Sequence, residues 1–598
     1  MAEIQNILLN EKLRVSNPKI NQNFQNINDQ LTSHLESTDA HSAGNISYIG
    51  QATGTNAKEA IDNTHKRISE IVAQSGDDNT EIVDARGGYT VLGDRINYID
   101  EQLSDLAYNV KNFGAIGDGV TDDTISIQAA IDAASTAGGG TVYFPPLGTD
   151  EHYIVSSILI PSDINLQGSK GSRIKQINDP DLGNLVQIAT GAKNIKVDGL
   201  ELDANKSNGS TGHGIGFSAN VSEVIISNNI VRNATIDCIH TEDGNFNVKI
   251  INNSCFDAGR IGIAMNGNSK NIFVSGNFCS GSFNSGINVI GTGDGVSIIG
   301  NIVDGAGDDG ITGYGNLQKD LLIDGNIIRN VSNNGIHIGG NGVFISDNVI
   351  SNCGNRGIYF ANSPLTTGEN VTISGNSIDT VTNLHGIEIL QCDNISIVGN
   401  SIFRVLVGRS ITLSAVKRGV VANNRVKGTT SDGIRLEKSS FVTITSNNIT
   451  GTTNGIQLSD DGITASKHNT ISFNILDGGS ARGIFFQNSS DFNVIIGNIV
   501  INYTIASYSL VGSNNISDFN LLRSQKGRFT GSGNGSATTF TIPHGLSGTP
   551  TFLNVTAGST AARGDYFVSA DATNITVTYG TAPVSGTNNV VLYWDAKA

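Results

Sequence analysis

Charged residues, tryptophan, methionine and proline are all scarce in this chain of 598 residues. Asp, Glu, Lys and Arg make up 15% of it, and it has one Trp, two Met and nine Pro. Basic residues are outnumbered by acidic ones, 37 to 54, so the net charge is −17. Without a basic surface, a nucleic-acid-binding role and electrostatic attachment to an anionic membrane are both disfavoured.

Long apolar runs are also missing. No stretch of about 18 apolar residues occurs, so we expect no membrane insertion. The start, MAEIQNILLNEKLR, lacks the basic and apolar segments of a secretory signal, and none is expected. The five cysteines show no zinc-like spacing, and Cys255 and Cys279 are expected to be small buried hydrophobes.

Glycine is abundant, with 72 residues, and one phrase recurs. It follows the template [VI]-x-[VI]-x-[GND]-N-x-[IV] and is spaced by about 24 residues. Its asparagines are residues 229, 253, 277, 301, 326, 348, 376, 400, 424, 447, 474 and 498. This period predicts a parallel β-helix of about 12 rungs, with the asparagines stacked at a turn in the left-handed conformation.

A second phrase, G-I-x-[IVLF], precedes each asparagine by about 15 residues. Its two apolar positions should face the core, so the middle residue x should point outward on one face of the β-helix. Down successive rungs the middle residues are Gly216, His240, Ala264, Asn288, Thr312, His337, Tyr359, Glu388, Thr412, Arg435, Gln457 and Phe485.

The segment before the repeats carries a family resemblance. Residues 110–155 contain FGAIGDGVTDDT, then AAIDAA, then GGGTVYFPP, and a helix is expected over about 122–136. This segment resembles the first part of pectate-lyase-like right-handed β-helix proteins, a superfamily that includes polygalacturonases and bacteriophage tailspikes. The resemblance covers roughly residues 108–525 and implies that the helix caps the β-helix. The aspartates at 118–123 are then part of the cap.

The two ends of the chain differ from the repeats. Residues 1–109 contain short heptad runs that predict a helical stalk needing oligomerisation. Residues 526–598 alternate apolar residues with Gly, Asn and Ser turns, which predicts a small β-sandwich tip for trimerisation or glycan binding. Stalk, β-helix (110–525) and tip in this order resemble a phage tailspike. The resemblance implies a homotrimer attached to the virion tail through its N-terminal region and acting outside the host cell.

Titratable residues concentrate on the predicted outer face between residues 308 and 435. Glycan cleavage needs an acid, a carboxylate for water or the sugar, cations for anionic groups and an aromatic face for a sugar ring. We predict as catalytic residues Asp308, Asp309 and Glu388. We predict as substrate-binding residues His337, Tyr359, His385, Asp432 and Arg435. Asp309 and Glu388 would be three rungs, about 14 Å, apart, and Glu388 with Asp432 is a second choice at about 10 Å.

Comparison with polygalacturonase motifs leaves the reaction open. GDDGI at 307–311, LHGIEI at 384–389 and IRLEK at 434–438 resemble three of that family's motifs in order, and TIDCI at 235–239 resembles a fourth faintly. The spacing departs from the family, so polygalacturonase activity is not predicted. A lyase or epimerase would instead use Tyr359 and His337 with Arg435.

The sequence therefore favours a tailspike depolymerase that hydrolyses a bacterial surface polysaccharide or teichoic acid. The alternatives are a polysaccharide lyase and a receptor-binding fibre without turnover. No cofactor is expected to be required, although an acidic stripe of oxygen ligands would suit Ca²⁺.

Overall fold

The computed structural model describes residues 66–67, 87–91, 93–98, 107–179, 182–208, 211–291, 293–313, 318–362, 368–460, 464–487, 490–518, 525–546 and 548–597. The chain divides into two compact units, 1–107 and 108–598. The predicted stalk lies almost wholly outside the described residues. Within it the structure describes residues 66–67, 87–91, 93–98 and 107–109, of which 66–67 and 93–98 are helical. Among the described residues, no helix has the length and apolar composition that a bilayer crossing requires.

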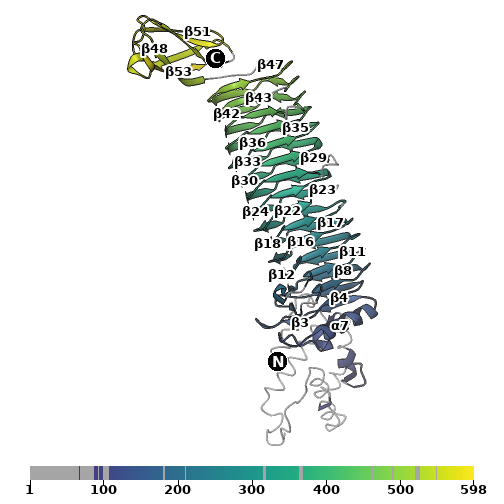
Figure 1. The fold of residues 1–598 in the computed structure, drawn as a ribbon. Coiled ribbons are helices and arrows are strands. Elements are labelled where there is room, and N and C mark those ends of the chain that lie inside the picture. The colour runs from purple at the N-terminus through teal and green to yellow at the C-terminus, as the bar shows by residue number, and fades with distance from the viewer. Residues whose placement is uncertain are drawn as a thin grey trace. The chain divides into compact units, whose positions relative to one another are not determined.

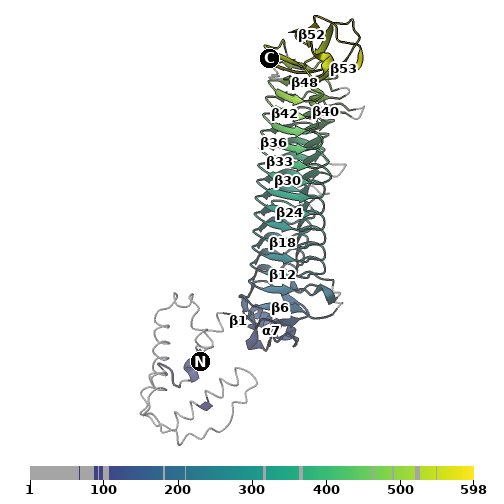
Figure 2. The same ribbon diagram turned by 90° about the vertical axis from the view of Figure 1, so that its left-hand side faces the viewer.

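The second unit contains a parallel β-helix, whose strands stack rung upon rung, and a C-terminal tip (Figures 1 and 2). Each rung contributes one strand to each of three parallel sheets, here called A, B and C. Sheet A comprises β1 (Tyr108–Asn109), β2 (Gly140–Tyr143), β5 (Ile164–Gln167), β8 (Lys193–Asp198), β11 (Ser222–Ser227), β14 (Phe246–Ile251), β17 (Lys270–Ser275), β20 (Ser297–Ile299), β23 (Lys319–Asp324), β26 (Asn341–Ser346), β29 (Gly368–Ser374), β32 (Cys392–Val398), β35 (Gly419–Ala422), β38 (Val442–Thr445), β41 (Thr470–Ser472), β44 (Val494–Ile496) and β47 (Ile516–Asp518).

Sheet B comprises β3 (Tyr153–Val155), β6 (Arg173–Gln176), β9 (Glu201–Asp203), β12 (Ile230–Arg232), β15 (Ser254–Phe256), β18 (Phe278–Ser280), β21 (Ile302–Asp304), β24 (Ile327–Val331), β27 (Val349–Cys353), β30 (Ser377–Val381), β33 (Ser401–Val405), β36 (Arg425–Thr429), β39 (Asn448–Thr452), β42 (Ile475–Gly479) and β45 (Ile499–Tyr503). Sheet C comprises β4 (Ile158–Ile160), β7 (Val186–Ile188), β10 (Ile215–Phe217), β13 (Ile239–Thr241), β16 (Ile263–Met265), β19 (Ile287–Val289), β22 (Ile311–Gly313), β25 (Ile336–Ile338), β28 (Ile358–Ala361), β31 (Ile387–Leu390), β34 (Ile411–Ser414), β37 (Ile434–Glu437), β40 (Ile456–Ser459), β43 (Arg482–Phe486) and β46 (Ala506–Ser509).

The β-helix is longer than the repeated phrase predicts. Sheets B and C each have 15 strands among the described residues, so the expected 12 rungs fall three short. The additional rungs begin at β3, β6 and β9. Where later rungs have the asparagine, these carry other residues, such as Ser172 and Leu200, so the template does not match them.

The twelve asparagines form one buried ladder between sheets A and B. Asn301 is typical: its amide donates to the backbone oxygen of Val274 and to Oδ1 of Asn326, at 2.9 and 3.0 Å. Its own Oδ1 accepts from the backbone and side-chain nitrogens of Asn277. The ladder is architectural, as expected. One detail was wrong, because the left-handed residue is the one before each asparagine, for example Gly300 with φ +62°.

The glycine of G-I-x-I is needed for close approach between rungs. At Gly335, whose φ is not in the left-handed region, an added Cβ would lie 2.4 Å from Cγ2 of Ile350 and 2.6 Å from the oxygen of Gly357. The same crowding recurs at Gly433 and Gly455. A glycine therefore avoids crowding between these rungs, whereas Cys238 and Ser410 occupy the same position in two other rungs.

Helix α7 (Thr124–Thr136) buries Ile127, Ala130, Ile131 and Ala134 in the core at the first rungs (Figure 1). The 3-10 helix η1 (Val110–Phe113) precedes it, and η2 (Lys206–Asn208) lies between β9 and β10. The nearby aspartates serve the turn before α7. Asp123 is buried and accepts hydrogen bonds from the backbone nitrogens of Ile116 and Gly117 at 2.7 and 3.0 Å.

All five cysteines are buried and free, with none in a disulfide. Cys255 and Cys279 face each other in adjacent strands of sheet B, as the sequence predicts. The tip contains two antiparallel three-stranded sheets. One is formed by β48 (Gln525–Gly533), β53 (Gly586–Lys597) and β50 (Phe552–Ala557), and the other by β49 (Thr539–Pro543), β52 (Asn574–Tyr579) and β51 (Tyr566–Ala570). The 3-10 helix η3 (Thr560–Ala562) follows β50, and Phe529 contacts Phe540 between the two sheets.

Candidate functional site

The outer face of sheet C carries two parallel columns of side chains. The first column is the middle residue of each strand, and the strand register pairs each middle residue with the next from Gly216 to Phe485, as the sequence predicts. The second column is the lead residue, three positions earlier, and backbone hydrogen bonds join it between rungs. The lead residues are His213, Asp237, Ile261, Ser285, Asp309, Asn334, Arg356, His385, Arg409, Asp432, Asn454 and Arg482.

Lead and middle side chains of one rung contact each other. His240 Nδ1 lies 2.7 Å from Asp237 Oδ2, and Arg435 Nη1 lies 3.4 Å from Asp432 Oδ2. Because residues i and i+3 meet in several rungs, the two columns form one surface, which is polar in most rungs and apolar at Ile261 and Ala264. Its middle rungs contain seven of the eight predicted site residues.

Three of those residues, Asp309, His337 and Tyr359, lie on consecutive levels and touch. Asp309 is 1% exposed, and its Oδ2 lies 3.1 Å from Nδ1 of His337. Its Oδ1 accepts from the backbone and side chain of Asn334 at 2.9 and 2.8 Å. The ring of His337 packs on that of Tyr359, with centroids 4.6 Å apart. A buried carboxylate therefore orients a histidine beside a phenol.

Arg356 joins this group to Glu388. Its guanidinium carbon lies 4.1 Å from the centroid of Tyr359, and its Nε pairs with Glu388 Oε2. His385 Nε2 faces Glu388 Oε1 at 3.6 Å, and its Nδ1 accepts the backbone N–H of Arg409 at 3.1 Å. We call these six residues the His337 cluster: Asp309, His337, Arg356, Tyr359, His385 and Glu388.

Burial shapes the protonation of this cluster. It lowers the pKa of His385 to about 3, helped by Arg409 and Arg356, so this imidazole is neutral at pH 7. The acceptor role of Nδ1 then places the single proton on Nε2, toward Glu388. Burial also raises the pKa of Tyr359, which keeps its hydroxyl protonated.

Asp432 and Arg435 lie two rungs beyond Glu388, in a separate group of ion pairs. Asp432 is 3.4 Å from both Arg409 and Arg435, and Arg435 Nε lies 2.7 Å from Glu437. Arg435 is three rungs from Tyr359, so the arginine beside the predicted tyrosine is Arg356 instead. Arg356 stands directly before the glycine of GIYF and was not among the predicted site residues.

The predicted acids do not converge on one point. Asp308 bonds to Asn333 in a different ladder, which continues through Asn355. Asp309 and Glu388 are three rungs apart, about 14 Å by rung spacing, and each has its own cationic or histidine partner. Their joint role in hydrolysis stays a prediction.

A second cluster near the first rungs was not predicted as a site, although TIDCI at 235–239 and the middle residue His240 were noted in the sequence. Asp237 is fully buried, and Arg260 donates to both of its oxygens, at 2.9 and 2.5 Å. His240 and His213 stack above it with centroids 3.9 Å apart, and Glu242 lies 3.3 Å from His240 Nε2. We call this the Asp237 cluster. Cys238 replaces the glycine in this rung, so the rung does not match the phrase G-I-x-[IVLF]. Asp237 can still be located from the sequence, because it lies three residues before His240.

Opposing effects set the charges there. Burial alone would raise the pKa of Asp237, but hydrogen bonds from His240 and Arg260 outweigh it, and the pKa is lower than usual. Burial lowers the pKa of His213 to about 4. His213 Nδ1 also accepts the backbone N–H of Asp237 at 3.3 Å, which agrees with a neutral ring.

Three family models match parts of the chain. Residues 107–312 match a model described as rhamnogalacturonase A/epimerase, pectate lyase-like, and residues 285–429 match one described as right handed beta helix region. The segment of this chain that forms sheets A, B and C is a right-handed, pectate-lyase-like β-helix. A third model, periplasmic copper-binding protein (NosD), matches residues 361–534, a segment that extends from the β-helix to β48 of the tip.

Curated relatives match only short pieces. Mannuronan C5-epimerase AlgE2 of Azotobacter vinelandii is 42% identical over 113 residues, which is 17% of this chain and 11% of the epimerase. Plasmin and fibronectin-binding protein A of Streptococcus pneumoniae is 50% identical over 70 residues, 12% of this chain and 9% of that protein. The chain thus spans about a tenth of the length of these relatives.

Solved structures share the β-helix at low identity. The tailspike of the Pseudomonas phage phi297 has a TM-score of 0.42 and 13% identity, covering 82% of this chain and 99% of the tailspike. An exopolygalacturonase from Thermotoga maritima has a TM-score of 0.41 and 16% identity, covering 56% of this chain and 93% of the enzyme.

Within the described residues, one group of metal-type side chains is close enough to share an ion: His213, Asp237 and His240. It lies outside the segment that matches the copper-binding model. Its stacked rings are 10° from parallel, so one ion cannot lie in both ring planes, and Arg260 occupies both carboxylate oxygens. Calcium needs six or more oxygen ligands, and this group offers one carboxylate. The β-helix as folded here does not suit either metal at this position.

Proposed function

We propose that this protein binds an acidic polysaccharide of a bacterial surface along the outer face of sheet C and shortens it at the His337 cluster. The observation that carries the proposal is the unbroken contact from Asp309 through His337 and Tyr359 to Arg356. These four side chains supply an oriented base, a protonated hydroxyl and a cation within consecutive rungs.

The chemistry that fits this arrangement is elimination from a uronic acid. Arg356 binds the sugar carboxylate, and His337, oriented by Asp309, removes the proton from the adjacent ring carbon. The electron pair forms a carbon–carbon double bond, the glycosidic C–O bond breaks, and Tyr359 donates its proton to the leaving oxygen. No water is consumed. Among the partial relatives, several are named mannuronan C5-epimerases and one an alginate lyase, which agrees with a uronate substrate.

Hydrolysis by Asp309 and Glu388 fits less well. Glycosidases hold their two carboxyls within about 9.5 Å, with room for water or attack on the sugar. Here the two residues are three rungs apart and paired with different partners. The elimination route uses residues that already touch.

The test is incubation with alginate, polygalacturonate, and host capsule and teichoic acid preparations, followed by size-exclusion chromatography, 235 nm absorbance and reducing-end assays. Shorter polymer with rising absorbance supports the proposal. The rate of absorbance increase should fall at least about 100-fold in His337→Gln and in Tyr359→Phe. The matched control is His468→Gln, an imidazole that stacks between Phe441 and Phe492 away from these columns.

New reducing ends without a rise in absorbance would contradict elimination. They would instead favour hydrolysis by Asp309 and Glu388. Binding without shortening across the panel would favour a receptor-binding role. One observation favours that second function: Glu388 and Asp432 are each paired with an arginine before any ligand binds. The partial relative from Streptococcus pneumoniae is named as a binding protein.

We further propose that the protein is a homotrimeric phage tailspike, attached to the tail through residues 1–109. The order of segments and the fold of known tailspikes support this arrangement. Light scattering of the full chain should give three times the monomer mass, and removal of residues 1–109 should abolish incorporation into tails. A monomeric full chain would contradict it.

A further inference from the structure

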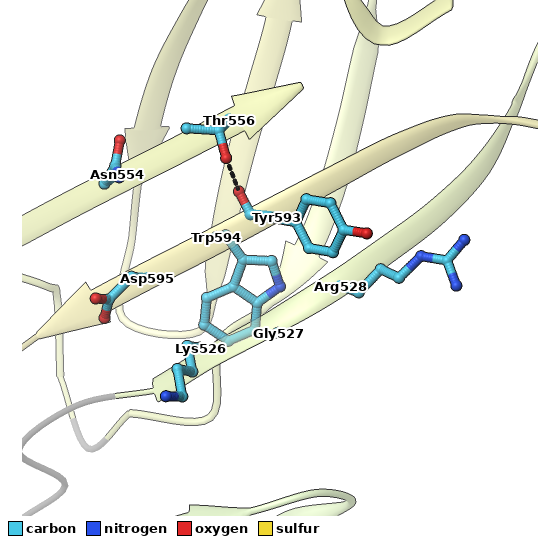
Figure 3. Close-up of a pocket in the computed structure, with 8 residues that line it drawn as sticks. All are labelled: Lys526, Gly527, Arg528, Asn554, Thr556, Tyr593, Trp594 and Asp595. Carbon is cyan, nitrogen blue, oxygen red and sulfur yellow. Dashed lines mark hydrogen bonds between the residues drawn. The ribbon is translucent and has the colours of Figure 1, made fainter. Parts of the chain in front are cut away.

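The tip has a shallow cavity, largely open to solvent, on the sheet formed by β48, β53 and β50. It has a volume of about 360 Å³. Eight residues line it (Figure 3): Lys526, Gly527, Arg528, Asn554, Thr556, Tyr593, Trp594 and Asp595. The volume lies at the low end of ligand pockets, which suits one or two sugar rings.

The strand register divides these residues between the two faces of the sheet. Tyr593 pairs with Arg528 on one side and Thr556 on the other, and Asp595 pairs with Lys526 and Asn554. Since side chains alternate along a strand, these six share one face. They are two cations, a carboxylate, an amide, a hydroxyl and a phenol, side by side.

Trp594, the one tryptophan of the chain, lies on the opposite face. Its indole is only partly buried and packs against Gly527, where an added Cβ would approach indole atoms to 2.9 Å. The glycine leaves the sheet thin at this point, with the indole directly beneath the polar face (Figure 3).

We propose that this cavity binds a sugar unit that carries a carboxylate or phosphate. Tyr593 is 50% exposed and offers its ring face to the C–H surface of a sugar. Lys526 and Arg528 give the cavity a local positive excess over Asp595, although the whole chain carries −17. Asn554 and Thr556 supply the hydrogen-bonding groups that hydroxyls need. The site is independent of cleavage by the β-helix.

Trp594 is a built-in reporter of this site. Excitation at 295 nm of the full-length protein gives emission from this residue alone, and we would titrate an oligomer of three mannuronate units against maltotriose. A saturable change with the acidic oligomer, at least tenfold weaker with the neutral one, is expected. Arg528→Ala and Tyr593→Ala should each weaken binding about tenfold or more, which is the loss of one charge-assisted or aromatic contact.

Three controls keep the result interpretable. Thr530→Ala, exposed on the same strand but outside the cavity, should bind normally. His337→Gln should also bind normally, so failure of the cleavage proposal and failure of this one are separable. An unchanged emission maximum shows that each variant is folded.

A titration without saturation would overturn the proposal. So would binding that survives both Arg528→Ala and Tyr593→Ala, or equal affinity for maltotriose. If Tyr593→Ala instead changes the oligomeric mass, this face is a contact between copies of the chain and the proposal is also overturned.

Discussion

The guanidinium of Arg356 lies over the ring of Tyr359, 4.1 Å from its centroid, while its Nε pairs with Glu388 in the next rung. One planar cation thus holds a phenol and a carboxylate at fixed positions. A lysine has no planar cation that could stack on the ring of Tyr359 and pair with Glu388 in the same way.

Arg356→Lys is therefore expected to raise the KM for an acidic polymer about tenfold or more, with a smaller loss in kcat. Steady-state kinetics at low and high salt would show it. The matched control is Arg404→Lys, an exposed arginine paired with Asp379 on sheet B. Equal kinetic effects of the two variants would contradict the role given to Arg356.

The asparagine ladder should be sensitive to a single gap. Asn301→Ala removes partners from Val274, from Asn326 and from both nitrogens of Asn277, all of them buried. Each unsatisfied group costs about 1–3 kcal/mol, so the free energy of unfolding should fall by at least about 2 kcal/mol.

Denaturant unfolding would measure this change. Asn352→Gly is the control, because Asn352 belongs to an exposed ladder, has φ +53° and donates to Asn330. Glycine tolerates that backbone, so the loss should stay below about 1 kcal/mol. Equal losses in the two variants would refute the account of the ladder.

Stability should fall as pH drops below neutral. His213 and His385 have pKa values of about 4 and about 3 in the folded protein, against 6.5 ordinarily. Between pH 6.5 and those values the unfolded chain binds protons that the folded chain does not, so unfolding is favoured as pH falls.

His385→Asn should reduce this dependence, because the asparagine oxygen can still accept the N–H of Arg409 without titrating. Melting temperatures at pH 7 and pH 4.5 would be compared in the two proteins. If the melting temperature falls equally between pH 7 and pH 4.5 in both proteins, His385 is not a neutral, buried residue.

The cysteines should be inert in the folded protein. Burial raises the pKa of Cys353 and of Cys392 to about 12, and hydrogen bonds with Cys238 and Cys279 raise that of Cys255. A thiol reagent should label none of the five at pH 8 and all five in guanidinium. Rapid labelling of any of them in native protein would show that the adjacent rungs open.

Sequence was a good guide wherever one residue type recurs at one place in every rung. The asparagine ladder, the middle column and the buried Cys255 and Cys279 follow directly from the period. The first three rungs were missed because Ser172 and Leu200 stand where later rungs use asparagine. Residues other than asparagine can occupy the turn between sheets A and B, so the template predicts too few rungs.

Contacts between rungs were less predictable. Arg356 reaches Glu388 across 32 residues, and Asp309 reaches His337 across 28, while rungs vary from 22 to 28 residues. Which side chains meet depends on how each side chain leans along the column, and the repeat does not encode that. The Asp237 cluster was overlooked for a simpler reason, the cysteine in place of glycine.

Each asparagine between the two ends of the ladder makes the same bonds to its two neighbours, so one rung can replace another. Loss of residues 277–300 would bring Asn301 beside Asn253 and Val303 beside Cys255, with no new kind of contact. The length of this β-helix can thus change in whole steps of about 4.8 Å. Gain or loss of a rung would alter the separation between the Asp237 and His337 clusters while leaving the chemistry of each intact.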